Sequence, residues 1–235
     1  MRALVLSSGG LFGAWQAGAW KALAAQFRPD LVVGASVGAL NGYCIACRMS
    51  PDELVDRWRR EELASFRDLH ANIRAMVEEA KPEIPLAVVA TDLLRLRPKV
   101  FHGAGLGWRQ LAASCAVPWF LPQVRIGGTL YSDGGLLNPL PVWAAAELGA
   151  TEILALNVLP EIPASLIRPF VRTFRHLAGH HPPLPSGVSL EVLKPDGPLG
   201  TMRDGLHWKR ENIERWLAQG HDRAKNISIL NCLGS

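Results

Sequence analysis

The chain has 235 residues, of which 49% are hydrophobic and 20% are charged, and its formal net charge is +4. This composition is typical of a globular protein, and the length suffices for one large core, so we expect a single domain over residues 1–235. No eighteen consecutive residues are apolar, so the sequence indicates no transmembrane helix. The mild positive charge permits attraction to an anionic membrane surface without requiring it.

The first 25 residues have two interpretations. Arg2, an apolar stretch and small residues near the end resemble a signal peptide. A buried strand followed by a glycine turn and a helix produces the same pattern. We favour the strand and helix, because the glycine-rich break and Lys21 interrupt any continuous apolar core.

Strands and helices alternate along most of the chain. Short apolar runs predict strands at 3–8, 30–36, 85–93, 99–103, 127–135 and 152–159. Helical spacing of apolar residues predicts helices at 14–27, 37–49, 52–66, 107–117, 141–149 and 212–224. This alternation is typical of an α/β fold with a largely parallel central sheet.

The region from about 160 to 200 differs from the rest, because prolines cluster there and the periodicity weakens. Within it, "SLIRPFVRTFRHLAGHH" (residues 165–181) places apolar side chains at helical spacing and arginines mostly on the other side. Such a basic amphipathic helix could lie on an anionic bilayer or cover an acyl pocket, although a surface helix packed on the core is the more common origin of this pattern. The proline-rich flanks suggest a flap that gates access to a site.

Four cysteines are present, and Cys44 and Cys47 form a C-x-x-C pair within a predicted helix. No second pair and no histidine pair follows at zinc spacing, so we interpret them as buried thiols rather than as a redox or metal site. Few cysteines and the lack of a clear signal sequence favour a reducing compartment, which predicts a cytoplasmic protein.

The segment "GASVG" (residues 34–38) follows an apolar strand and precedes a helix. G-x-S-x-G in this context is the pattern of a nucleophile turn, in which Gly34 and Gly38 remove side chains where strand and helix crowd each other. The N-terminus of the helix would favour negative charge near Ser36. Ser36 could equally be an ordinary helix N-cap, so the segment alone leaves both interpretations open.

A hydroxyl is a weak nucleophile without a base. None of the seven histidines lies in a glycine turn at a strand end, so a histidine triad has weak support. Asp133 in "YSDGG" does lie at a strand end, although a plain Asp-Gly turn has the same spelling. Because the carboxyl ends of parallel strands share one edge of the sheet, we expect Asp133 and Ser36 to converge there. Asp is a poor base at its reference pKa of about 3.9, so the site must be partly dry.

The turn "SSGGLFG" (residues 7–13) follows the first strand and could place backbone N–H groups of Gly9, Gly10 and Leu11 around an oxyanion. The spacing G-G-x-x-G differs from the dinucleotide fingerprint, and the second strand does not end in an acidic residue. Nucleotide binding is therefore disfavoured. Further along, Gly13 and Gly18 are interpreted as packing glycines.

Taken in order, the glycine-rich loop, G-x-S-x-G, and D-G-G followed by Asn and Pro resemble the patatin-like phospholipases. The resemblance runs from "LVLSSGG" through "ATDL" (Ala90 to Leu93) to "SCAVPWFLPQVRIGGTLYSDGGLLNPLPV" and fades after Pro160. It implies a three-layer α/β/α fold and a Ser–Asp dyad without histidine. The implied site residues are nucleophile Ser36, base Asp133, oxyanion loop Gly9, Gly10 and Leu11, and turn supports Gly134, Gly135 and Asn138.

The chain departs from the family pattern in the first loop. The family loop usually reads G-G-G-x-Arg/Lys-G, whereas here Ser8 replaces the first glycine and Phe12 replaces the cation. Neither change removes a catalytic group. For Asn138, a role in holding the turn and that of an ordinary polar loop residue both remain open.

These observations predict a lipid acyl hydrolase that cleaves carboxylic esters through an acyl-enzyme, with no metal or organic cofactor and no nucleic-acid partner. The alternative is a non-catalytic lipid- or acyl-binding protein on the same scaffold, for which the altered loop is the best support. Peripheral contact with a membrane fits either function. The sequence does not specify the head group or chain length of the lipid, or the oligomeric state of the protein.

Overall fold

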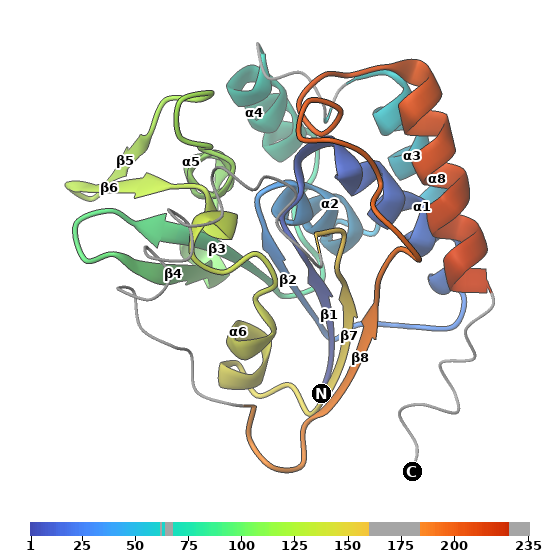
Figure 1. Cartoon of the computed structure of the whole chain (residues 1–235). Helices are drawn as coiled ribbons and strands as arrows, with labels where there is room; N and C mark the ends of the chain where they lie inside the picture. The colour runs from blue at the N-terminus through green and yellow to red at the C-terminus, as the bar shows by residue number, and fades with distance from the viewer. Residues whose placement is uncertain (62, 64–67, 160–183, 226–235) are drawn as a thin grey trace.

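The computed structural model describes residues 1–61, 63, 68–159 and 184–225, which are organised around one mixed β-sheet (Figure 1). The sheet order is β5-β6-β3-β2-β1-β7-β8, with β4 paired to β3 off this path. The strands are β1 Arg2–Leu6, β2 Leu31–Ala35, β3 Leu86–Asp92, β4 Arg97–His102, β5 Val124–Ile126, β6 Thr129–Ser132, β7 Glu152–Leu156 and β8 Ser189–Leu193. The predicted parallel pairing is confirmed for β1, β2, β3 and β7, and β8 also pairs in parallel, whereas β4, β5 and β6 are antiparallel.

Helices cover both faces of the sheet. They are α1 Gly13–Leu23, α2 Val37–Ala46, α3 Pro51–Arg59, α4 Leu69–Glu79, α5 Trp108–Ser114, α6 Val142–Glu147 and α8 Arg210–Lys225, with short 3₁₀ turns η1 Gly10–Phe12, η2 Gly103–Gly105 and η3 Gly134–Leu136. Successive side chains of a strand point to opposite faces, so Leu4 and Leu6 of β1 join the larger core, with α1 to α5 and α8. Ala3 and Val5 join a smaller core under α6. The predicted three-layer α/β/α arrangement is confirmed, with one layer much thicker than the other.

In the thicker layer, α1 and α8 approach each other closely (Figure 1). A Cβ atom on Gly18 would overlap the carbonyl oxygen of Leu217, and a Cβ atom on Gly220 would overlap that of Trp15. Backbone atoms of one helix therefore lie directly against the other. Gly18 is confirmed as a packing glycine by this contact.

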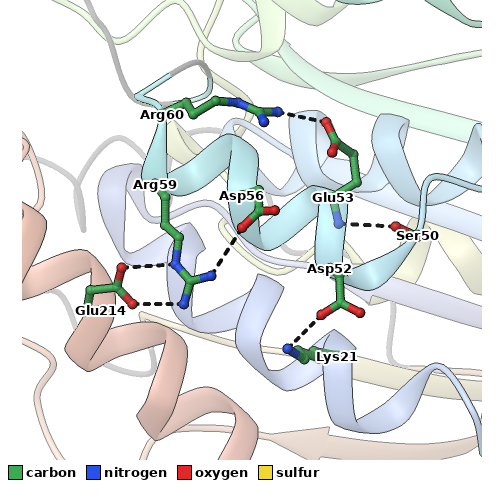
Figure 2. Close-up of polar contacts among 8 residues, drawn as sticks. All are labelled: Lys21, Ser50, Asp52, Glu53, Asp56, Arg59, Arg60 and Glu214. Atoms are coloured by element: carbon green, nitrogen blue, oxygen red, sulfur yellow. Dashed lines mark hydrogen bonds and ion pairs between the residues drawn. The ribbon is translucent and has the colours of Figure 1, made fainter.

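Ion pairs stabilise the solvent side of this layer, and the Ser50 hydroxyl caps the start of α3 by accepting from the Glu53 N–H (Figure 2). The Arg59 guanidinium bonds to both carboxylate oxygens of Glu214 in α8, at 2.9 and 3.0 Å, and to Asp56 at 3.1 Å. Lys21 of α1 pairs with Asp52 of α3 at 2.7 Å. These contacts join α1, α3 and α8 into a unit that lies outside the sheet.

The helix predicted over 52–66 is shorter in the structure. It ends at Arg59, because Arg60 leaves helical geometry and Glu61 has φ 65°. A further helix, α4, begins at Leu69 and was not predicted. Its buried residues Leu69, Ile73, Met76 and Val77 have helical spacing, so the signal was present in the sequence.

Two strands were also missed. β8 falls in the region from 160 to 200, where little order was expected, yet it pairs in parallel with β7 over its full length. As an edge strand it buries only Leu193, so no clear apolar pattern marks it. β5 has only three residues, which is too short for a periodicity to be read.

The proposed basic amphipathic helix at 165–181 lies outside the described residues, as do Cys232 and three of the histidines. Among the helices that the structure describes, none combines the length and the hydropathy needed to cross a bilayer. The described cysteines are free thiols, and burial raises the pKa of Cys44 to about 12 and that of Cys47 to about 11. Such thiols are poor nucleophiles at neutral pH, as expected of packing residues.

Candidate active site

Ser36 lies at the sharp turn between the end of β2 and the start of α2. Its backbone has φ 55° and ψ −129°, a conformation that costs a non-glycine residue about 1–3 kcal/mol. A Cβ atom on Gly34 would overlap the carbonyl oxygen of Gly38, and one on Gly38 would overlap that of Leu6. The predicted strand–turn–helix context of "GASVG" is thereby confirmed, and both flanking glycines are required by close contacts.

Ser114 holds this strained turn in place. The Ser36 N–H donates to Ser114 Oγ at 2.8 Å, and Ser114 Oγ donates to the carbonyl oxygen of Val89 in β3 at 2.6 Å. Ser114 is fully buried at the end of α5. The sequence analysis missed its role, because nothing in "AASCA" indicates a partner 78 residues away.

Asp133 reaches Ser36 through the antiparallel part of the sheet. The pairing of β2 with β3 stops at Ala35 and Val89, and β6 pairs with β3 from Thr91 onward. β6 thus continues the sheet beyond the end of β2, and Asp133 follows its last residue. Asp133 was expected at the edge where the carboxyl ends of parallel strands meet. It does lie at the end of β2, but it follows β6, which runs antiparallel to β3 and therefore also to β2.

Backbone bonds fix Asp133 on both sides. Its N–H donates to the Ala116 carbonyl at 3.0 Å, and its own carbonyl accepts from Thr91 Oγ1 at 2.8 Å. In the following turn, a Cβ atom on Gly134 would overlap the Val89 carbonyl and would lie 3.2 Å from Ala35 Cβ. The turn after Asp133 therefore packs directly on the end of β2, beside Ser36.

The Asp133 carboxylate is buried with few partners. Oδ1 accepts from the Gly135 N–H at 2.7 Å, whereas Oδ2 has no hydrogen-bond partner among the described residues. Burial raises the pKa of Asp133 from its ordinary value near 3.8 to about 6, and the neighbouring Ser36 hydroxyl and the Gly135 N–H oppose this rise. A carboxyl with such a pKa is mostly ionised at neutral pH and is more basic than an exposed aspartate.

No described histidine takes part in this arrangement. His70 of α4, His102 of β4, His207 and His221 make no hydrogen bond to Ser36 or Asp133. His70 instead lies near the Trp108 ring, at the start of α5. Among the described residues, Asp133 is the carboxyl whose pKa the neighbouring Ser36 hydroxyl lowers.

The loop of Gly9, Gly10 and Leu11 lies beside the serine turn, because Gly38 packs against the backbone oxygens of Leu6 and Ser7 at the start of this loop. The N–H groups of Gly9 and Gly10 donate to no described residue. Leu11 differs: its N–H donates to the Gly205 carbonyl at 2.9 Å. While that bond is intact, Leu11 is not available as the predicted third oxyanion donor.

The two departures from the family loop have structural roles. Ser8 donates its N–H to the Pro139 carbonyl at 2.8 Å, and its Oγ touches Gly135, so it joins the first loop to the turn after Asp133. Phe12 is buried and packs edge-on against Trp216 of α8 at 4.9 Å between ring centroids. An aromatic contact with the core thus occupies the position of the family's cation.

Asn138 also belongs to the turn after Asp133. Its N–H donates to the Gly134 carbonyl at 3.4 Å, a long bond that closes the turn. This bond involves the backbone only, so the part played by its side chain stays a prediction.

A buried polar network lies beneath both loops and was not predicted. Gln16 Nε2 donates to the Ser7 carbonyl at 2.8 Å, and Asn41 Nδ2 donates to the Gly13 carbonyl at 2.9 Å and to Gln16 Oε1 at 3.0 Å. Trp58 Nε1 donates to Asn41 Oδ1 at 2.9 Å. The network connects the first loop, α1, α2 and α3. Gln16 and Asn41 are polar residues in apolar helices, which is the sequence signal that could have drawn attention to them.

Comparison with known proteins places this chain in a sequence family. The family described as patatin-like phospholipase matches residues 4–103 and 79–146. The chain is 26% identical over 181 residues to patatin-like phospholipase domain-containing protein 7 of Rattus norvegicus and 30% identical over 181 residues to protein 6 of that series in Homo sapiens. Each alignment covers 66% of this chain and 13% of the relative, so the chain spans a small part of these proteins.

A solved structure shows the same fold at larger coverage. VipD from Legionella pneumophila superimposes with a TM-score of 0.51 and 14% identity over 95% of this chain and 66% of that one. This likeness concerns the fold alone. The family match, which covers more than half of the sequence and includes both Ser36 and Asp133, establishes that the chain belongs to the patatin-like phospholipase family.

Proposed function

We propose that this protein hydrolyses carboxylic esters of lipids, with Ser36 as nucleophile and Asp133 as general base. The observation that carries the proposal is a strained, buried serine beside a buried carboxylate, one oxygen of which accepts no hydrogen bond from the described residues. Membership of a phospholipase family supports a lipid ester as substrate. Relatives named phospholipase and lysophospholipase suggest a glycerophospholipid or its lyso form.

In the first step, Asp133 accepts the Ser36 hydroxyl proton as Oγ attacks the ester carbonyl carbon. The carbonyl oxygen becomes an oxyanion, to which the free N–H groups of Gly9 and Gly10 donate. Leu11 would join them only after its bond to Gly205 opens. The tetrahedral intermediate then collapses, the alkoxide leaves with the proton held by Asp133, and the acyl group stays on Ser36.

In the second step, water replaces the alcohol. Asp133 takes a proton from the water, the resulting hydroxide attacks the acyl carbon, and the same N–H groups stabilise the second oxyanion. When the carbon–oxygen bond to Ser36 breaks, Asp133 returns the proton to Oγ. The raised pKa of Asp133, about 6, suits both roles, since the group is ionised near neutral pH yet basic enough to accept a proton.

A serine-directed fluorophosphonate probe and an ester substrate together test the proposal. The unmodified protein should be labelled at Ser36 and should release fatty acid, whereas Ser36→Ala should do neither and Asp133→Asn should do neither at a measurable rate. Ser186→Ala and Asp196→Asn, both at exposed positions, serve as matched controls. Labelling at another serine, or full hydrolysis by Asp133→Asn, would show that the dyad is wrongly assigned.

A second candidate function is lipid or acyl binding without turnover. The bond from Leu11 to Gly205 favours it, because it leaves the oxyanion loop with two free donors in the described structure. Retention of a fluorescent fatty acid with neither labelling nor hydrolysis would support this function over catalysis.

A further inference from the structure

The segment from Leu93 to Ser132 has an unusual charge. It contains no aspartate or glutamate and five basic residues, Arg95, Arg97, Lys99, Arg109 and Arg125. It thus carries more positive charge than the whole chain, whose net charge is +4. Figure 1 shows that its elements, β4, α5, β5 and β6, gather on one side of the molecule, away from α1, α3 and α8. We call residues 93–132 the cationic lobe.

Most of these charges are exposed and lack acidic partners. Arg97, Lys99 and Arg109 are exposed and form no ion pair with any residue the structure describes. Arg95 pairs with Asp92 at 3.0 Å. The acids that border the lobe in sequence, Asp92 and Asp133, are both buried. The surface of the lobe therefore presents positive charge at Arg97, Lys99 and Arg109 that no acidic residue of the described chain neutralises.

The lobe also exposes large hydrophobic side chains. Within the described chain the three most exposed are Trp119 at 83%, Leu94 at 77% and Phe120 at 54%, and all three belong to the lobe. Leu94 lies in the turn between β3 and β4, and Trp119 and Phe120 follow α5. Trp119 has φ 68°, a left-handed conformation that is rare for a bulky residue. Trp119 and Phe120 thus expose two large aromatic side chains at adjacent positions.

The aromatic turn is close to the candidate site. Ala116, whose carbonyl accepts from the Asp133 N–H, precedes Trp119 by three residues. Three residues of chain span at most about 11 Å between Cα atoms. A surface that contacts Trp119 and Phe120 is therefore also near Asp133.

We propose that the cationic lobe docks the protein on an anionic lipid bilayer. Arg97, Lys99 and Arg109 face the negative head groups, and Trp119 and Phe120 enter the interfacial region, where aromatic side chains are favoured. Both charge and exposed apolar surface fit this partner, whereas a nucleic acid would not account for the exposed Leu94 and Phe120. The proposal rests on the proposed function in one respect: docking serves to bring lipid esters to Ser36.

Binding to vesicles tests the charge contribution. All variants carry Ser36→Ala, so the vesicles stay intact and the result does not depend on whether Ser36 is the nucleophile. Sedimentation is measured with vesicles of phosphatidylcholine containing about one third phosphatidylserine, at low salt. Arg97→Gln/Lys99→Gln/Arg109→Gln should partition on the order of 100-fold more weakly, from about fivefold per cation.

The matched control is Arg28→Gln/Lys194→Gln/Lys225→Gln, which removes the same charge from exposed positions outside the lobe and should lose less than about fivefold. Equal losses in the two triple variants would overturn the proposal, since they would reveal only a net-charge effect. Binding that does not depend on phosphatidylserine would overturn it as well. Thermal unfolding of each variant checks that the fold is retained.

The apolar contribution is tested separately. Trp119→Ser/Phe120→Ser should weaken partitioning at least about tenfold, while Val192→Ser, at an exposed apolar position on β8, should leave it unchanged. Undiminished binding by the double variant would exclude insertion of the aromatic turn. Failure of the proposed function is a separate outcome. In that case the protein that retains Ser36 would not hydrolyse a dissolved short-chain ester, whether or not it binds vesicles.

Discussion

The layer formed by α1, α3 and α8 and the turns around Ser36 and Asp133 are stabilised in opposite ways. In the helical layer, Arg59 and Lys21 find carboxylate partners in neighbouring helices (Figure 2). Around the candidate site, Ser36 has a strained backbone, and Asp133 is buried with one oxygen lacking a hydrogen bond in the described chain. Charged side chains thus have opposite charges beside them in the first region, whereas the second contains backbone strain and a buried carboxylate.

This contrast indicates where the fold gains stability and where it holds reactive groups. Strain and an under-solvated carboxylate lower the free energy of unfolding, and they persist because Ser114, Thr91 and the network under the loops fix the surrounding backbone. Substitutions in the two regions should therefore have opposite consequences. Substitutions at the site should remove activity without loss of stability. Substitutions in the helical layer should lower stability without loss of activity.

The largest expected effect is on the rate of ester hydrolysis. Ser36→Ala removes the proposed nucleophile and should lower kcat/KM at least about 10³-fold. Because glycine accepts φ 55° freely, Ser36→Gly should be more stable than Ser36→Ala by about 1 kcal/mol. Denaturant unfolding of both variants measures this difference. A less stable glycine variant would argue against strain at this turn.

A substitution in the helical layer should change the stability of the protein but not its activity. Gly220→Ala places a methyl group against the Trp15 carbonyl, and a backbone atom cannot easily move aside, so the free energy of unfolding should fall by about 3 kcal/mol. Hydrolysis per folded molecule should change little. Gly197→Ala, whose Cβ atom would meet nothing within 4 Å, is the matched control. Equal stability of the two variants would contradict the close contact of α1 and α8.

Asp133→Asn should stabilise the protein at high pH while abolishing hydrolysis. Because burial raises the pKa of Asp133 in the folded state to about 6, its protonated form contributes stability that is complete below about pH 4 and lost as pH rises through 6. At pH 8 the ionised carboxylate lowers the free energy of unfolding, so removing the charge should raise that energy by about 1–2 kcal/mol. Urea unfolding at pH 8 and pH 4 tests the sign, with no gain expected at pH 4.

The same pKa predicts the pH dependence of activity. Asp133 must be ionised to act as the proposed base, so kcat/KM for a dissolved ester should be level above about pH 7 and fall about tenfold per pH unit below 6. Activity and the stability contribution of Asp133 should thus change in opposite directions with pH. If kcat/KM falls only near pH 4, the base is an exposed carboxylate with an ordinary pKa instead.

The smallest effect should come from the surface ion pairs. Arg59→Gln breaks the contacts with Glu214 and Asp56, but these side chains are more than 40% exposed, so solvent screens them and the free energy of unfolding should fall by only about 0.5 kcal/mol. High salt should remove the difference from the unmodified protein. Thermal unfolding at two salt concentrations, with Arg28→Gln as control, measures it. Activity should be unaffected.

The sequence was informative wherever a feature depends on residues that are neighbours in the chain. The turn at Ser36 needs glycine at positions 34 and 38, and the turn after Asp133 needs glycine at 134, because backbone atoms touch there. Such requirements produce recognisable sequence motifs, and the family resemblance rests on those motifs. Most strands and helices were predicted for the same reason, since their apolar spacing is local.

The tertiary structure determined the contacts between segments that are distant in sequence. The apolar pattern of β6 is the same for either direction, and its antiparallel course follows from the free edge that β3 offers where β2 ends. The Ser114 hydroxyl as the acceptor for the Ser36 N–H, and the Gly205 carbonyl as the acceptor for the Leu11 N–H, likewise depend on hydrogen bonds between segments distant in sequence. A backbone hydrogen bond fixes no residue type at either partner, and a side-chain hydroxyl such as that of Ser114 does not reveal in the sequence which distant group it binds. The tertiary structure therefore decided these long-range supports of the candidate site.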